Sequence, residues 1–208
     1  MNFFDQTKST RLLIQNYKSF GSEEHGFDRI EPINVIVGRN NSGKSALLDL
    51  VQFSCGNLQF SPSTHNRTGP LRVVLETLLT GAVIERVFPR GTIGGPINGN
   101  HFEFGKQYIG RRIRIGISGT SKTFDSIDST GIHQLPPTMG QNLATAVESP
   151  LAGKSFKRLA ADRDVVPEGN GDKIGITQNG NGFTNAIQRF TNQASLPNDL
   201  VEKNFWKS

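Results

Sequence analysis

The sequence predicts an α/β fold in which a strand, a phosphate-binding loop and a helix are followed by an antiparallel meander of strands. Three observations predict it. An apolar run at 33–37 turns at Gly38 into a glycine-flanked loop, apolar residues return at helical spacing from Ala46, and from Leu71 apolar and polar residues alternate. The first two patterns are typical of a strand–loop–helix unit, and the third is typical of half-buried strands.

The loop after the apolar run has the composition of a phosphate site. Glycine at its two ends allows positive φ angles and a close approach of backbone amides to an anion. The Lys44 ammonium is expected to reach the β and γ phosphates of a nucleotide, and the Ser45 hydroxyl to ligate Mg²⁺. We predict that the nucleotide is bound by Gly38, Arg39, Asn40, Asn41, Ser42, Gly43, Lys44, Ser45 and Ala46.

Two segments resemble ATPase heads of the ABC type. The loop with its flanks, residues 34–50, resembles the first nucleotide motif of the SMC, RecF, Rad50 and OLD-like group, and 12–20 resembles the segment with which those proteins begin. The resemblance implies a P-loop NTPase of the broad AAA family, with ATP and Mg²⁺ as cofactors. It also implies that Lys18 or Phe20 lies near the base, although a solvated lysine and a core aromatic explain the two residues equally well.

The same resemblance implies a function for the complete protein. Heads of this group dimerise around ATP, so a head-to-head homodimer or larger oligomer is expected, acting in DNA repair, DNA maintenance or defence against phage. Two alternatives stay open: a non-hydrolysing nucleotide-gated interaction module and a small-molecule kinase. The meander after the first helix is typical of ABC-type heads and disfavours the kinase, because most other phosphate-loop folds continue with parallel β–α units.

The first elements are predicted from local patterns. Residues 1–9 are expected to be a frayed leader, 11–17 a strand and 21–26 a polar loop. Pro32 opens the strand at 33–37, since a missing N–H is tolerated at a strand start. The helix from Ala46 should end at a glycine cap near Gly56 and be followed by a loop at 56–70.

The later elements are less regular. Strands are predicted at 71–79, 82–88, 101–109 and 111–117. A short helix is expected at 142–148, because Pro136, Pro137 and Pro150 break the surrounding segment. Residues 156–164 resemble a strand of OLD-like ATPases, which makes Arg163 a candidate for a charged role near the nucleotide or at a head–head interface. A local salt bridge is the alternative. An amphipathic helix is predicted at 183–194 and a capped helix from Asp199.

Charge permits a nucleic-acid partner without requiring one. The net charge is +5, with no long basic run. A cluster of Lys106, Arg111, Arg112 and Arg114 faces either a ligand or DNA, or forms a solvated sheet face. Residues 117–120 superficially resemble the ABC signature, but the signature opens a helix and this segment is predicted to end a strand.

The residue composition narrows the cellular compartment expected for the protein. The single cysteine, Cys55, excludes an internal disulfide and fits a reducing compartment, so a cytoplasmic location is predicted. Its apolar surroundings favour a small buried residue over a nucleophile. No signal peptide and no apolar run of about 18 residues is present, so no membrane association is expected.

The 208 residues are predicted to form one partial ATPase head domain. Its parts are 10–55 with the loop and first helix, 70–130 with the meander, and 155–208, which has the pattern of a truncated end. The resembled ATPases hydrolyse ATP with the acidic pair of a Walker B strand and with a signature helix, and neither is found in this sequence. We therefore predict no catalytic residue in this chain, weak or no ATP binding by the chain alone, and no turnover. ATP hydrolysis is expected of the complete protein.

Overall fold

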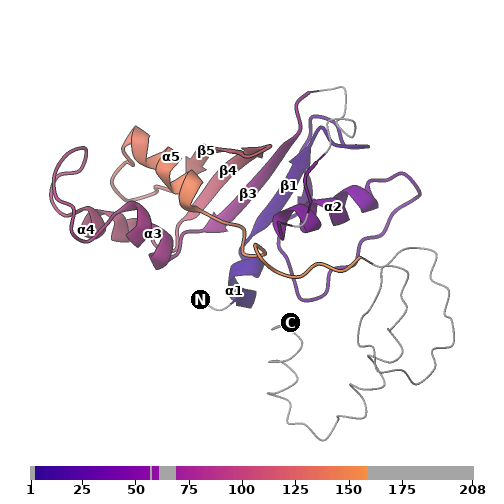
Figure 1. Cartoon of the computed structure of the whole chain (residues 1–208), viewed down its shortest axis with the longest axis horizontal. Helices are drawn as coiled ribbons and strands as arrows, with labels where there is room; N and C mark the ends of the chain where they lie inside the picture. The colour runs from indigo at the N-terminus through magenta and orange to yellow at the C-terminus, as the bar shows by residue number, and fades with distance from the viewer. Residues whose placement is uncertain (1–2, 57, 61–68, 159–208) are drawn as a thin grey trace, which may run out of the picture. The chain divides into compact units, whose positions relative to one another are not determined.

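The computed structural model describes residues 3–56, 58–60 and 69–158. The chain divides into two compact units, Met1–Lys154 and Ser155–Ser208. All the helices and strands of the described residues lie in the first unit (Figure 1). The fold that positions the candidate site is therefore the fold of that unit.

Of the second unit, only residues 155–158 are described, and they have no regular secondary structure. The predicted role of Arg163 falls outside the described residues. So do the predicted helix at 183–194 and the capped helix from Asp199. These remain predictions.

One five-stranded sheet organises the first unit, and every pair of neighbouring strands is antiparallel. The strands are β1 (Arg11–Gln15), β2 (His25–Phe27), β3 (Arg72–Leu78), β4 (Arg112–Ser118) and β5 (Ser121–Ile127). Their spatial order is β2-β1-β3-β4-β5, which puts β3 at the centre. The predicted α/β fold with an antiparallel meander after the first helix is confirmed.

The first unit also contains helices, two of which pack against strands of the sheet (Figure 1). They are α1 (Phe3–Lys8), α2 (Lys44–Ser54), α3 (Gly81–Val87), α4 (His101–Gly105), the 3₁₀ turn η2 (Lys106–Tyr108) and α5 (Pro137–Ala146). α2 contacts β1, α5 contacts β5 and β4, and α3 contacts α5. The core is built from alternate strand positions and from single helix faces, and includes Leu12, Ile14, Val73, Leu75, Ile113 and Ile115 with Leu50 and Leu143.

Two segments predicted as strands are helices. The run at 82–88 is α3, whose first turn is capped by the Thr80 hydroxyl accepting from the Val83 amide at 3.3 Å. The run at 101–109 is α4 with η2, and Asn100 caps it by accepting from the Glu103 amide at 3.1 Å. A cap satisfies one of the unpaired amides of a helix start, so these two polar side chains favour helix over the strand that apolar content suggests.

The predicted leader at 1–9 is also wrong. Residues 3–8 form α1, and Thr7 and Thr10 are buried. The Ile30 amide donates to the Thr7 carbonyl at 3.2 Å, and the Thr10 hydroxyl lies 3.1 Å from the hydroxyl of Thr77 in β3. These contacts tie α1 to the sheet.

Two other elements differ from the prediction, β5 because no strand is predicted there and α5 in its boundaries. β5 was not predicted, because its alternation is mostly polar and its residues are only half-buried or exposed. α5 covers 137–146 in place of 142–148. Pro137 begins α5 and does not break it, since a proline is tolerated in the first turn, where its missing N–H has no partner.

The run at 33–37, predicted as a strand, is not one. It has no regular secondary structure, and its backbone makes no backbone hydrogen bond among the described residues. The side chains of Ile33, Val35 and Val37 are 83%, 81% and 88% exposed. A strand needs neighbours for its backbone groups, and the five positions of the sheet belong to other segments.

Replacing Val35 with lysine should leave the thermal unfolding midpoint nearly unchanged, because the valine side chain buries little area. The same change at Val73, which is fully buried in β3, should prevent folding, because it puts an ammonium group into the core. Circular dichroism melts of the two variants provide the measurement. A large loss of stability in Val35→Lys would mean that this run is packed in solution.

Cys55 is a buried thiol at the end of α2, as predicted, and 6% of it is exposed. Burial raises the pKa of its thiol, so little reactive thiolate forms near neutral pH. Iodoacetamide at pH 8 should therefore alkylate the folded chain slowly and the urea-unfolded chain quickly, with mass spectrometry as the readout. Equal rates in the two states would contradict the buried position.

Candidate phosphate-binding site

The loop at 38–43 connects the exposed run to α2. Residues 38–42 are exposed, and the Ser42 amide donates to the Arg39 carbonyl at 3.2 Å, which closes a tight turn. Asn41 and Gly43 have φ angles of 64° and 93°. Positive φ angles of this kind turn successive amides to one side of the chain, which is the geometry that anion-binding loops use.

At both glycines of the loop an added side chain would meet neighbouring atoms, and Gly43 also has a positive φ angle. A methyl group added at Gly38 would lie 2.4 Å from the Ser42 hydroxyl oxygen. One added at Gly43 would lie 2.3 Å from Cζ of Phe20. At Gly43 the obstacle is the ring of the buried Phe20, whereas at Gly38 it is the exposed Ser42 side chain, which can rotate away. Gly43 is therefore the position that lacks room for a side chain while the loop keeps this shape.

Lys44 reaches back over the loop. Its Nζ donates to the carbonyl of Gly38 at 2.7 Å and to that of Arg39 at 2.6 Å. The ammonium group is therefore held at the beginning of the loop, six residues before its own position in the chain. A positive charge at this point is suited to the outer phosphates of a bound polyphosphate.

The start of α2 offers amides in addition to the charge. Gly43 is the N-cap and supplies no side-chain acceptor, and the helical hydrogen bonds begin with the Leu47 amide donating to the Gly43 carbonyl at 3.1 Å. Among the described residues, the amides of 44–46 donate to no backbone carbonyl. These amides and the positive end of the helix dipole favour an anion at the loop.

The remaining predicted site residues differ in exposure. Arg39, Asn40 and Ser45 have exposed side chains, whereas Ala46 is 1% exposed and can offer a ligand only its amide. The loop brings the nine predicted residues together in one short stretch, as continuity of sequence requires.

Mg²⁺ fits this site only with phosphate present. In the part of the chain that is described, no three His, Cys, Asp or Glu side chains lie close enough to hold a metal ion. Mg²⁺ keeps several waters and takes phosphate oxygens together with one or two protein ligands. The exposed Ser45 hydroxyl at the start of α2 fits that arrangement as the one protein ligand.

Lys18 and Phe20, which the family resemblance placed near the base, have structural partners. Lys18 donates to the carboxylate of Asp49 in α2, and Phe20 is 8% exposed with its ring against Gly43. Sequence reasoning missed Asp49, although a carboxylate on the apolar side of a predicted helix is unusual enough to be noticed.

The basic cluster is engaged by acceptors. Arg114 pairs with Glu76, Glu24 and Asp125, and Arg111 lies 3.6 Å from Asp128. Lys106 pairs with Glu103, and the Arg112 guanidinium donates to the Ser9 carbonyl. Of the two alternatives, these contacts favour the solvated sheet face over a DNA surface. The segment at 117–120 ends β4 and turns into β5, so it does not open a helix.

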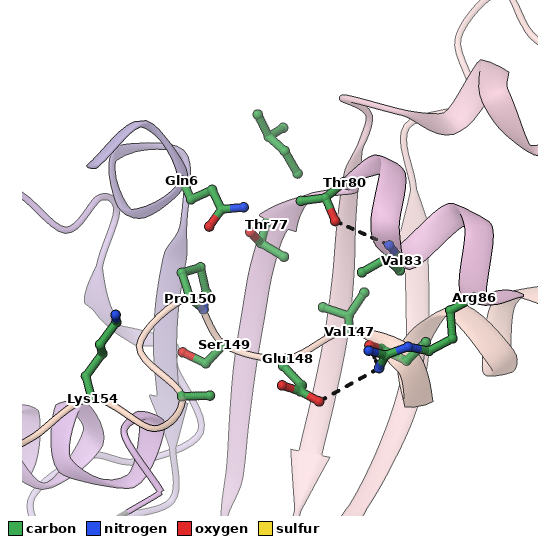
Figure 2. A pocket seen from close by; sticks show the side chains of 13 residues that line it. Gln6, Thr77, Thr80, Val83, Arg86, Val147, Glu148, Ser149, Pro150 and Lys154 are labelled. Carbon is green, nitrogen blue, oxygen red and sulfur yellow. Dashed lines mark hydrogen bonds and ion pairs between the residues drawn. The ribbon is translucent and has the colours of Figure 1, made fainter. Parts of the chain in front are cut away.

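A separate hollow of about 450 Å³ lies away from the predicted residues (Figure 2). Its polar lining comes from α1, from the end of β3, from α3 and from the segment after α5, and comprises Gln6, Thr77, Thr80, Arg86, Glu148, Ser149 and Lys154. Arg86 and Glu148 lie 3.9 Å apart and are 65% and 69% exposed. None of residues 38–46 line the hollow, so it is separate from the predicted phosphate site, and the Arg86 charge there is paired with Glu148. The loop, which combines an ammonium group with uncapped helix amides, is the better candidate site.

Comparison with known proteins adds a family. The sequence pattern of the AAA domain family matches residues 11–206. No curated protein matches the chain. One similar solved structure is described as structural biochemistry of ATP-driven dimerization and DNA-stimulated activation of SMC ATPases. The two sequences are 19% identical, the match covers 67% of this chain and 80% of the chain in that structure, and the TM-score is 0.28. None of the described helices is long and apolar enough to cross a membrane.

Proposed function

This chain belongs to the AAA domain family, and on that premise we propose that it binds ATP with Mg²⁺ in the loop at 38–46. One observation carries the proposal: the Lys44 ammonium is held at the start of a loop whose far end presents the uncapped amides of α2. The broad family that the two sequence segments indicated is confirmed by the match over 11–206.

Each part of the loop has a role in this proposal. The amides from Gly38 to Gly43 and those of 44–46 surround the phosphates, and the Lys44 ammonium leaves its two carbonyl partners for the β and γ oxygens. Ser45 is the protein ligand of Mg²⁺, which neutralises charge on those same oxygens. Arg39 and the two asparagines line the rim, because their side chains are exposed.

The test is a titration of the ¹⁵N-labelled chain with ATP and Mg²⁺, followed by amide chemical shifts. Binding is expected to be weak and to shift the amides of 38–46 first. AMP is the matched control and should shift them little, since it lacks the β and γ phosphates that the ammonium recognises. No shift at high ATP, or equal shifts with AMP, would overturn the proposal.

The finer function is proposed from the resemblance of the two sequence segments. The chain would form the N-terminal lobe of an SMC/RecF/OLD-like ATPase head that pairs head to head and acts in DNA repair, DNA maintenance or defence against phage, in the cytoplasm. The alternative is a non-hydrolysing nucleotide-gated module. Hydrolysis that depends on a Walker B acid in a longer gene product containing this chain favours the ATPase. Nucleotide binding without turnover in that product favours the module.

A further inference from the structure

A compact turn at 16–21 lies behind the phosphate loop. The backbones of Tyr17 and Phe20 exchange two hydrogen bonds of 3.1 and 2.9 Å, and the Asn16 amide donates to the Gly21 carbonyl at 2.7 Å. Asn16 and Lys18 have φ angles of 54° and 51°. Non-glycine residues at positive φ are uncommon, so this shape is enforced by its surroundings.

The turn touches the loop at Gly43. The nearest ring carbons of Phe20 lie 2.3 and 2.4 Å from where a methyl group at Gly43 would sit, and the Ser19 hydroxyl oxygen lies 3.1 Å from it. The Phe20 ring also stacks on the ring of His25 in β2, with centroids 4.6 Å apart and planes at 18°. Phe20 therefore fills the space between the sheet and the last residue of the loop.

The turn holds α2 at a second point. The carboxylate of Asp49, a residue that is 5% exposed, accepts from the Tyr17 hydroxyl at 3.0 Å and from Lys18 Nζ at 2.5 Å. Asp49 lies six residues after Gly43, more than one helical turn further on. Contacts at two places along the axis fix both the position and the rotation of the helix.

We infer that Phe20 and Asp49 are positioning residues for the nucleotide: they set the direction in which the first amides of α2 and the Lys44 ammonium point. The inference rests on the proposed function of the loop. It assigns to the turn a role in affinity, which packing alone does not imply. A displacement of about 1 Å at a recognition group is enough to weaken binding or catalysis strongly.

The central variant is Phe20→Leu, which keeps an apolar side chain but empties part of the space behind Gly43. Its matched control is Phe104→Leu, the same change in α4, where the ring centroid lies 6.1 Å from that of Phe88 and 5.8 Å from that of Tyr108. Phe20→Leu should weaken ATP·Mg²⁺ binding about tenfold. Phe104→Leu should lower the unfolding midpoint while leaving the affinity unchanged.

A readout that needs no nucleotide separates this inference from the proposed function. Gly43 lies against the Phe20 ring, so its amide chemical shift should move in Phe20→Leu and stay constant in Phe104→Leu. If the unmodified chain binds no ATP, the proposed function fails while the Gly43 shift still tests the contact. An unmoved Gly43 amide, or equal affinity losses in the two leucine variants, would overturn the inference.

Asp49→Asn provides the second variant in case Phe20→Leu does not fold. It keeps the shape and the acceptor for Tyr17 but removes the charge that holds Lys18. The affinity for ATP·Mg²⁺ should fall a few-fold and the amides of 44–46 should shift. Unchanged affinity and unchanged amides in a folded Asp49→Asn would show that the second contact has no positioning role.

Discussion

Replacing Lys44 with alanine should remove detectable binding of ATP·Mg²⁺. The ammonium donates to the carbonyls of Gly38 and Arg39 in the structure, so it is already placed at the loop. In the proposed complex it makes charge-assisted hydrogen bonds to two phosphates, each contributing about 1.5–3 kcal/mol. A loss of about 3 kcal/mol is roughly a hundredfold in affinity, which takes a weak interaction out of the measurable range.

The amide titration described for the proposed function measures this effect. Lys106→Ala is the control, because it removes the same charge from an exposed surface pair with Glu103. It should bind ATP·Mg²⁺ as the unmodified chain does. The melting temperature of Lys44→Ala should change little, since the hydrogen bonds of its ammonium are made to two exposed loop residues, Gly38 and Arg39. Undiminished binding by Lys44→Ala would mean that the phosphates lie elsewhere.

The elements that the sequence predicted correctly are those whose own residue pattern specifies the secondary structure that the fold also requires. α2 follows from apolar residues at helical spacing and from the glycine after it, since Gly56 has a φ angle of 82°. β3 follows from the apolar run Val73–Leu75, and β4 follows from isoleucine at every second position. In each, the local preference agrees with the tertiary packing.

The missed elements show where local pattern fails. α3 contains β-branched residues that favour a strand, and only the cap at Thr80 indicates a helix. β5 is a strand because β4 accepts its backbone, although its own alternation is mostly polar. The run at 33–37 is the opposite case, because four of its five residues are β-branched and favour a strand, yet no partner strand exists among the described residues.

The residues of the candidate site also differ in whether local sequence predicts them. Loop composition predicts which residues surround an anion, because glycine and lysine act through their own backbone and charge. The supports behind the loop come from distant segments: Phe20 and Asp49 meet the loop and the turn only after folding. Spacing along the chain does not encode such contacts, so the residues that position the site could not be predicted with those that form it.

Changing Glu76 to glutamine should cost about 2 kcal/mol of unfolding free energy. Glu76 lies on the central strand with 9% of its side chain exposed, and its carboxylate accepts from Arg11 at 3.3 Å and from Arg114. Glutamine keeps the shape but removes the charge, which leaves two guanidinium groups facing an amide. Both arginines are partly exposed, at 39% and 27%, so water limits the penalty below that of a fully buried pair.

Urea unfolding of Glu76→Gln beside Glu103→Gln isolates this effect. Glu103 pairs with Lys106 on an exposed helix surface, with 64% of its side chain accessible, so the same chemical change there should cost less than about 0.5 kcal/mol. High salt should narrow the difference little, because the Glu76 carboxylate is shielded from solvent whereas the Glu103 pair is not. Equal midpoints for the two variants would show that the ion pairs across β1, β3 and β4 do not stabilise the fold.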